Sequence, residues 1–139
     1  MTTPTSRSPD LVPGLEGTAE TLVKPELTAP VMGSGMVEVY ASPAVVALME
    51  AAAVACADRY LASGETSLGI RFELNHTAAT PPGMKVSAKA TLVEVDGRKL
   101  TFTIEAHDAK ERIANARHTR IIVDRARFDA KLEAKARQS

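Results

Sequence analysis

Residues 42–57 read SPAVVALMEAAAVACA, and the fold depends on this stretch. Ser42 is a favoured helix N-cap, and Pro43 suits the first helical position because its missing N–H is not needed there. The Ala-rich sequence continues to about Leu61, and Ser63-Gly64 provides a stop. Because the first half of the segment is apolar on every face, we expect a helix that is wrapped by protein.

The sequence after this helix changes to a period of two, which indicates β-strands. Residues 68–77 form the first such segment, and Thr80-Pro81-Pro82-Gly83 interrupts the chain after it. Alternate residues of this strand should point toward the helix. These residues are Leu68, Ile70, Phe72, Leu74 and His76.

Further strands are expected on both sides of the helix in the sequence. Residues 17–28 have strand character, but Pro25 confines such a strand to an edge or a bulge. Residues 29–35 contain Pro and Gly and indicate a loop. Asp96-Gly97 predicts a hairpin turn. The strands after the Pro-Pro break are residues 84–92, 100–106 and 113–123.

This order of elements is an edge strand, one long helix and a meander of antiparallel strands. It predicts an α+β fold in which a curved sheet wraps a single helix. Residues 1–14 are rich in Thr, Ser and Pro and should form a flexible lead-in. We expect residues 15–139 to form a single domain. Residues 126–137 are charged and Ala-rich and predict a short, solvated helix.

The composition excludes several classes of function. A formal net charge of +0 and an aromatic content of 4% without Trp argue against nucleic-acid binding. Cys56 is the only cysteine, so no intrachain disulfide forms, and a reducing cytoplasm fits best. The N-terminus lacks the apolar core of a signal peptide, and the longest apolar stretch is too short to span a bilayer. We therefore expect a soluble cytoplasmic protein with no membrane partner.

Glu50 is the only charged residue in the helical stretch 42–57. Burying an ionised carboxylate without partners costs several kcal/mol, so it should be paired, or neutral with a raised pKa. A structural ion pair with an arginine of the sheet, or a helix end turned to water, would also account for it.

His76 and Ser42 are the other candidates for chemistry. A lone histidine on an apolar face is more often a core residue, but His76 lies at a strand end beside a loop, where a site would open and where it could approach Glu50. Capping alone explains Ser42, which lies about 12 Å along the helix from Glu50. The helix N-terminus beside Ser42 offers free N–H groups for an oxyanion.

Other catalytic motifs are absent from the sequence. It contains no GxSxG elbow, Walker loop, GxGxxG or HExxH motif. His107 and His118 lie on different predicted strands without metal-ligand spacing. We expect neither a metal nor a cofactor.

Three segments, YASPAVVALMEAA, SLGIRFELNHTAATPPG and AHDAKERIANARHTR, resemble the fluoroacetyl-CoA thioesterase-like branch of the hotdog-fold superfamily. The resemblance runs from about Val37 to Lys131 and implies a hotdog fold, a homodimer and an acyl-CoA substrate. Members hydrolyse acyl-CoA thioesters with a hydroxyl residue, a glutamate and a histidine, which by position are Ser42, Glu50 and His76. The family hydroxyl is typically Thr, so Ser42 is a departure.

The resemblance also implies which residues bind the substrate. The backbone N–H of Gly69 and the side chain of Arg120 match positions that line the family's site. Where the fluoroacetyl-specific enzyme carries phenylalanines over the acyl group, this chain has Gly33 and Met36. This less aromatic lid, with Met36 against the substrate, predicts a different, small or medium acyl group.

The sequence thus favours a homodimeric acyl-CoA thioesterase. Glu50 would act as nucleophile or as general base for water, and His76 would transfer protons near neutral pH. Two alternatives stay open. One is a hotdog-type enoyl-CoA hydratase or dehydratase, and the other is a non-catalytic acyl-CoA binding module with Glu50 in a structural ion pair.

Overall fold

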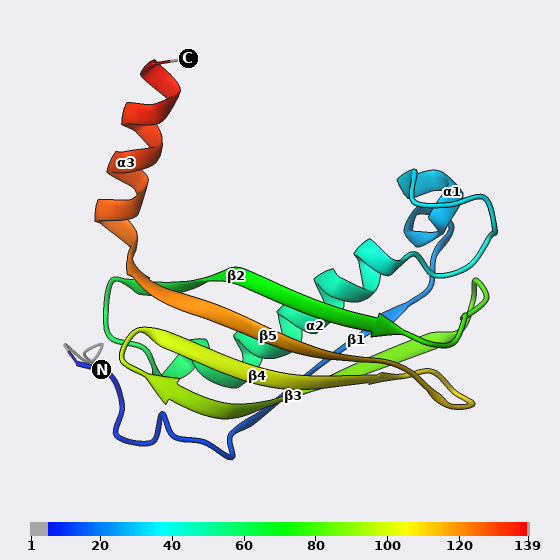
Figure 1. The fold of residues 1–139 in the computed structure, drawn as a ribbon, viewed down its shortest axis with the longest axis horizontal. Helices are drawn as coiled ribbons and strands as arrows, with labels where there is room; N and C mark the ends of the chain where they lie inside the picture. Colours follow the sequence, from blue (N-terminus) through cyan, green and yellow to red (C-terminus); the bar gives the residue numbers. More distant parts are fainter. Residues whose placement is uncertain (1–5, 139) are drawn as a thin grey trace.

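The structure is a computed structural model that describes residues 6–138. One curved antiparallel sheet lies along the long helix α2 (Figure 1). The strands are β1 (Glu16–Leu22), β2 (Glu65–His76), β3 (Lys85–Asp96), β4 (Lys99–His107) and β5 (Arg112–Asp124). The helices are α1 (Ala29–Met32), α2 (Ser42–Ala57) and α3 (Arg125–Arg137), with 3-10 turns η1 (Pro25–Leu27) and η2 (Asp58–Tyr60).

The strand order is β1-β3-β4-β5-β2, and every neighbouring pair is antiparallel. The expected edge position of the first strand is confirmed, because β1 pairs only with β3, but the strand ends at Leu22 and Pro25 begins the turn η1. The predicted meander holds for β3, β4 and β5, but β2 pairs with β5 at the opposite edge. The connection from β2 to β3 contains Pro81-Pro82 and is too long for a tight hairpin, so the two strands separate.

The predicted faces of β2 are correct for only part of the strand. The register shifts between Gly69 and Arg71, which leaves Ile70 unpaired in a bulge and 52% exposed. One extra residue exchanges the two faces of a strand. Ser67 and Gly69 therefore face α2 before the bulge, and Phe72 lies partly buried after it.

Helix α2 is covered on one side only. A Cβ at Gly17 of β1 would overlap the backbone of Cys56, so the absence of a side chain lets the strand lie directly on the helix. The sheet-facing residues are Ala44, Val45, Leu48, Met49, Ala52, Ala53, Cys56 and Ala57.

The other side of α2 remains open in the single chain, so the expectation of a fully wrapped helix is not met within one chain. Small or apolar side chains recur there at helical spacing around Ser42 and Glu50, and we call this surface the open stripe. An apolar helix face is stable in water only when another protein surface covers it. The exposed or half-buried residues of the open stripe are Ser42, Pro43, Val46, Ala47, Glu50, Ala51, Val54 and Ala55.

The segments outside the sheet differ in how they pack. The expected loop 29–35 contains the single-turn helix α1, which ends at Gly33 in the left-handed conformation (φ 77°). Helix α3 confirms the predicted C-terminal helix and projects away from the sheet (Figure 1). Residues 6–14 of the expected lead-in lie against the body through buried Leu11 and an Arg7–Glu65 ion pair, whereas residues 1–5 lie outside the described residues.

Within residues 6–138, no helix combines the length and the hydropathy that crossing a membrane requires.

Candidate active site

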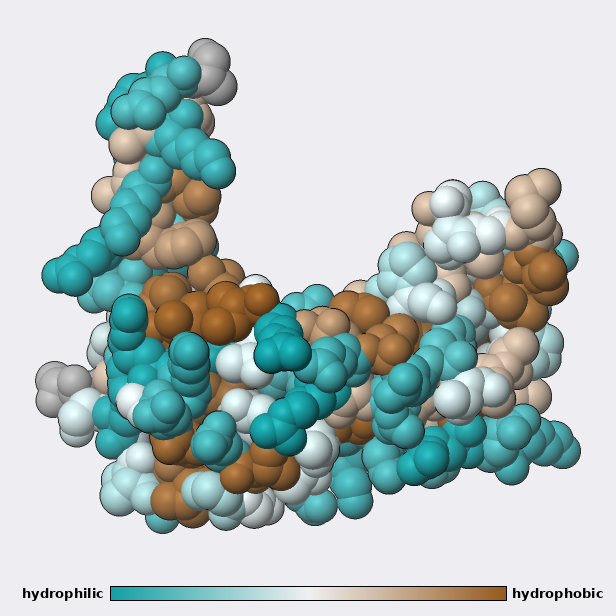
Figure 2. Space-filling model, in the orientation of Figure 1, coloured by the Kyte–Doolittle hydropathy of each residue, from teal (hydrophilic) through white to brown (hydrophobic). Residues whose placement is uncertain are grey.

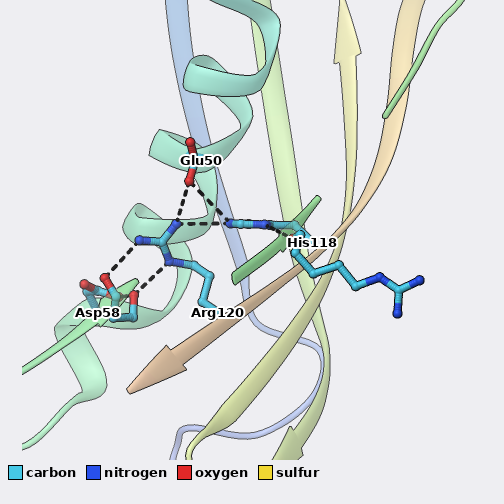
Figure 3. Close-up of polar contacts among 6 residues, drawn as sticks. Glu50, Asp58, His118 and Arg120 are labelled. Carbon is cyan, nitrogen blue, oxygen red and sulfur yellow. Dashed lines mark hydrogen bonds and ion pairs between the residues drawn. The ribbon is translucent and has the colours of Figure 1, made fainter. Parts of the chain in front are cut away.

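Glu50 lies on the open stripe of α2 and points toward two basic side chains of β5 (Figure 3). Its Oε2 atom lies 3.4 Å from Nη1 of Arg120 and 3.9 Å from Nε2 of His118. The carboxylate is paired, as expected for an acid in an apolar helix, yet its side chain is 41% exposed. Glu50 is therefore held by the sheet while one side of it remains open.

Arg120 is buried and held by other protein groups. Its Nε donates to Oγ of Ser67 at 2.9 Å, and Nη2 donates to the Ser67 carbonyl at 3.0 Å. The Ser67 hydroxyl in turn donates to Oδ1 of Asp58 at 2.6 Å. All three guanidinium nitrogens thus have protein partners, and Nη1 is the one directed at Glu50.

His118 is only 1% exposed, and its hydrogen bonds define its tautomer. Nδ1 lies 2.8 Å from the Arg71 carbonyl and must donate to it, which leaves the Nε2 lone pair to accept from Nη1 of Arg120 at 3.1 Å. Burial lowers the pKa of His118, and the charge of Arg120 adds to this, while the Arg71 carbonyl and Glu50 oppose it. The ring is therefore neutral and orients Arg120.

Sequence reasoning missed this part of the site. It placed His118 among unused histidines and did not single out Ser67 or Asp58. One pattern in the sequence does connect two of the residues: His118 and Arg120 are separated by one residue on a strand and so share a face.

Gly69 completes the surroundings of Glu50. A Cβ at this position would lie 2.7 Å from Oε2 of Glu50 and 2.9 Å from Cε1 of His118. Glu50 Oε2 ends a flexible side chain, but the His118 ring is buried and fixed, so glycine is needed for the strand to lie against this ring.

Substituting Gly69 with alanine should push the side chains of Glu50 and His118 away from β2. We expect the Gly69→Ala variant to lose about 1–3 kcal/mol in free energy of unfolding, as for other overpacked sites. Urea unfolding measures this loss. The matched control is Gly35→Ala, whose Cβ would meet nothing closer than Ala29 Cβ at 3.5 Å and should change stability little. Equal stability of the two variants would contradict the tight packing around Glu50.

Ser42 and His76 form a second pair. Oγ of Ser42 lies 2.7 Å from Nδ1 of His76. The expected capping role of Ser42 is wrong, because α2 begins at Ser42 itself, its N-cap residue is Ala41, and no side chain caps it. The hydroxyl is instead engaged by the imidazole.

The other ring nitrogen of His76 has no partner. Nε2 is buried and makes no hydrogen bond to any group in residues 6–138. Burial lowers the pKa of His76, and the Ala78 backbone only partly offsets this. Buried polar atoms without partners are rare in folded proteins and often belong to functional sites. One nitrogen of the neutral imidazole is thus buried beside the protein backbone without a hydrogen bond of good geometry.

The two groups of residues line different hollows of the single chain. Ser42 and His76 line one of about 350 Å³ together with Met36, whose side chain is 95% exposed. Glu50 and Gly69 line another of about 250 Å³. The structure therefore brings Ser42 to His76 and Glu50 to Gly69 and Arg120, but it does not bring Glu50 and His76 together within one chain.

No group of three or more His, Cys, Asp or Glu side chains within residues 6–138 is arranged to hold a metal ion.

Comparison with known proteins places the chain in a family. The model of the fluoroacetyl-CoA-specific thioesterase family matches residues 23–126. A fluoroacetyl-CoA thioesterase of Streptantibioticus cattleyicolor is 42% identical over 98 residues, which cover 70% of each chain.

Solved structures agree with this match. A structure of the fluoroacetyl-CoA thioesterase FlK superposes with a TM-score of 0.84 at 35% identity, covering 89% of this chain and 96% of that one. A thioesterase superfamily member from Thermus thermophilus gives 0.86 at 28% identity, covering 94% and 96%. The chain therefore belongs to the fluoroacetyl-CoA-specific thioesterase family and has the hotdog fold.

Proposed function

We propose that this protein hydrolyses acyl-CoA thioesters as a homodimer, in which Ser42 and His76 of one protomer act together with the partner subunit's Glu50. The observation that carries this proposal is the division of the candidate residues. The chain builds a hydroxyl–imidazole pair with a free buried nitrogen, and separately a carboxylate fixed by Arg120. Each half lacks what the other half supplies.

A dimer interface along β2 and α2 is supported by the uncovered surfaces of the chain. Strand β2 has a free edge, and its Ile70 is exposed beside Val46 and Glu50 of the open stripe. Figure 2 shows a hollow between α3 and the α1 segment, whose floor carries hydrophobic patches separated by hydrophilic side chains. A second copy that pairs with the β2 edge would cover both the unpaired backbone groups and the open stripe.

Two-fold symmetry supports the exchange of residues between protomers. Val46 lies midway between Ser42 and Glu50 on the open stripe, about 6 Å along the helix from each. If two α2 helices cross antiparallel at Val46, each Ser42 lies opposite the partner subunit's Glu50. Both sites are then built from the same two halves.

In this arrangement the Ser42 hydroxyl donates to the thioester carbonyl oxygen. The Nδ1–H of His76 orients that hydroxyl, and the N–H groups at the start of α2 help to stabilise the oxyanion. Neutral His76 keeps its Nε2 lone pair for proton transfer.

Glu50 can act by either of two routes. As a general base it takes a proton from water while the water oxygen bonds to the carbonyl carbon and the C–S bond breaks. As a nucleophile it forms an acyl-glutamyl anhydride, releases the thiolate and is regenerated when water attacks the anhydride. In the general-base route the proton taken by Glu50 passes through Nε2 of His76 to the CoA thiolate, which regenerates the carboxylate. In the nucleophile route Nε2 takes a proton from the water that attacks the anhydride and passes it to the thiolate. The products of both routes are the free acid and CoA.

The lid supports a broader acyl specificity than an aromatic lid would allow. Met36 is the exposed lid residue over Ser42 and His76, and Gly33 ends α1 without a side chain. We expect small or medium acyl groups to be accepted. The cytoplasm, where Cys56 stays reduced and acyl-CoA is available, is the proposed location.

The proposal is tested by measuring free thiol release from a panel of acyl-CoAs that varies chain length and α-substituents, fluoroacetyl-CoA included. Enoyl-CoA hydration is assayed beside it to separate the hydratase alternative. Turnover of at least one saturated acyl-CoA is expected. Tight acyl-CoA binding without turnover would instead favour a binding module and overturn the proposal.

A further inference from the structure

We propose that a hollow at the base of α3 binds the phosphorylated nucleoside end of CoA through Arg98, Arg127 and Lys131. This inference rests on the proposed function, because it assigns the part of the substrate that lies away from the thioester.

The hollow has a volume of about 220 Å³ and lies where α3 leaves the sheet. Arg98 comes from the turn between β3 and β4, and Arg127 and Lys131 come from successive turns of α3. Phe128 and Ile122 supply apolar surface between these cations. Residues distant in the sequence thus converge on one concave, positively charged surface.

The three cations are available for an external anion. Within residues 6–138, no side-chain hydrogen bond or ion pair is made by Arg98, Arg127 or Lys131. Other cations in the described part of the chain also lack ion pairs, for example Lys24 and Lys110, but Arg98, Arg127 and Lys131 surround one hollow. The formal net charge of the chain is +0, yet three cations without ion pairs gather around one hollow. This local excess of positive charge points to an anionic ligand.

Two carboxylates also line the hollow, and both are already engaged. Glu65 pairs with Arg7 at 2.9 Å, and the hydrogen bond from Arg7 lowers the pKa of Glu65. Asp124 accepts a hydrogen bond from the Arg127 backbone N–H at 2.9 Å as the N-cap of α3. The Glu65–Arg7 pair adds no net charge, and Asp124 offsets only one of the three cations, so the hollow keeps a positive charge.

The combination of groups fits the nucleotide of CoA. Arg and Lys side chains bind phosphate oxygens through charge-assisted hydrogen bonds, and an aromatic face such as that of Phe128 stacks on a nucleobase. The low aromatic content and balanced charge of the chain as a whole argue against a nucleic-acid strand as the ligand.

The distance from the thioester site also fits. Glu65 lies four residues before Gly69 on β2, or about 13 Å at the rise of a strand. The pantetheine arm of CoA has about twelve bonds between its sulfur and the diphosphate, as many as roughly four extended residues, and so also reaches about 13 Å. The arm of a thioester beside Glu50 and Gly69 is therefore long enough for the diphosphate to reach this hollow.

The test compares two substrates that differ only in the nucleotide. The Arg127→Ala/Lys131→Ala double variant should raise KM for an acyl-CoA by about tenfold, through loss of two charge-assisted contacts, with kcat unchanged. The same acyl group on pantetheine, which lacks the nucleotide, should show the same KM in wild type and variant. The matched control is Lys135→Ala/Arg137→Ala, which removes the same charge from α3 outside the hollow and should leave both substrates unaffected.

Binding of adenosine 3′,5′-bisphosphate, followed by calorimetry, tests the site without turnover. Wild type should bind it, and the Arg127→Ala/Lys131→Ala variant should bind it about tenfold more weakly. An unchanged KM for acyl-CoA in an active enzyme, or an equal loss with acyl-pantetheine, would overturn this site while leaving the thioesterase proposal intact. Nucleotide binding that survives in a wild type without turnover would overturn only the thioesterase proposal.

Discussion

Replacing Glu50 with glutamine is expected to lower kcat for acyl-CoA hydrolysis by about 10³, the scale of losing a positioned acid–base group. Glutamine keeps the size of the side chain and an oxygen that can accept from Arg120, but it cannot attack the thioester or take a proton from water. Thiol release at saturating substrate measures the loss. The melting temperature and the elution volume should stay close to those of wild type.

The control for this substitution is Glu20→Gln. Glu20 is an exposed glutamate of β1 that pairs with Lys85, and it lies at the opposite edge of the sheet from β2. It should retain wild-type kcat because a surface ion pair contributes little. Glu50→Gln activity within a few-fold of wild type would show that the carboxylate is structural.

His76→Ala is expected to lower kcat/KM by about 10²–10³, since it removes both the orientation of Ser42 and the proton carrier. The pH profile gives a second readout. Burial lowers the pKa of His76 below the ordinary 6.5, so the neutral form persists on acidification past that value. Wild-type kcat/KM should therefore hold at pH 6.5 and decline only at lower pH, as the imidazole gains a proton.

Variants of Ser42 give the matching control. Ser42→Thr keeps the hydroxyl that bonds to His76 and should stay active, whereas Ser42→Ala should lose activity as His76→Ala does. A wild-type acid limb centred above pH 6.5 would contradict the role given to neutral His76. So would full activity of Ser42→Ala.

The sequence predicted the local elements of the fold well and its long-range pairing poorly. The Ala-rich run that begins at Ser42-Pro43, the alternation after it and the Asp96-Gly97 turn located α2 and the strands, because these patterns depend on near neighbours. The pairing of β2 with β5 depends on contacts between distant segments. The bulge at Ile70 follows from such pairing and reversed the predicted face of the first half of β2.

The sequence identified the candidate site residues, but it did not identify the groups that they contact. Ser42 has the pattern of a helix cap, and only the position of His76 shows where its hydroxyl goes. The fixing of Arg120 by Ser67 depends on the same bulge, which turns Ser67 toward α2.

One feature of the sequence agrees with the proposed dimer. The first half of helix α2 is apolar on every face, but the sheet of one chain covers only one side of the helix. The uncovered side carries Ser42 and Glu50. The sequence predicts a helix wrapped by protein, and the structure of one chain leaves the open stripe uncovered. The two agree if a second copy of the chain covers the open stripe.

Activity of a mixed dimer tests this account most directly. A His76→Ala chain and a Glu50→Gln chain, co-expressed with different tags and purified as the heterodimer, are each inactive as homodimers. If each site combines His76 of one protomer with Glu50 of the partner subunit, the heterodimer contains one intact site and should recover roughly half of the wild-type kcat per dimer. A heterodimer as inactive as the two parent homodimers would show that no site is shared between protomers.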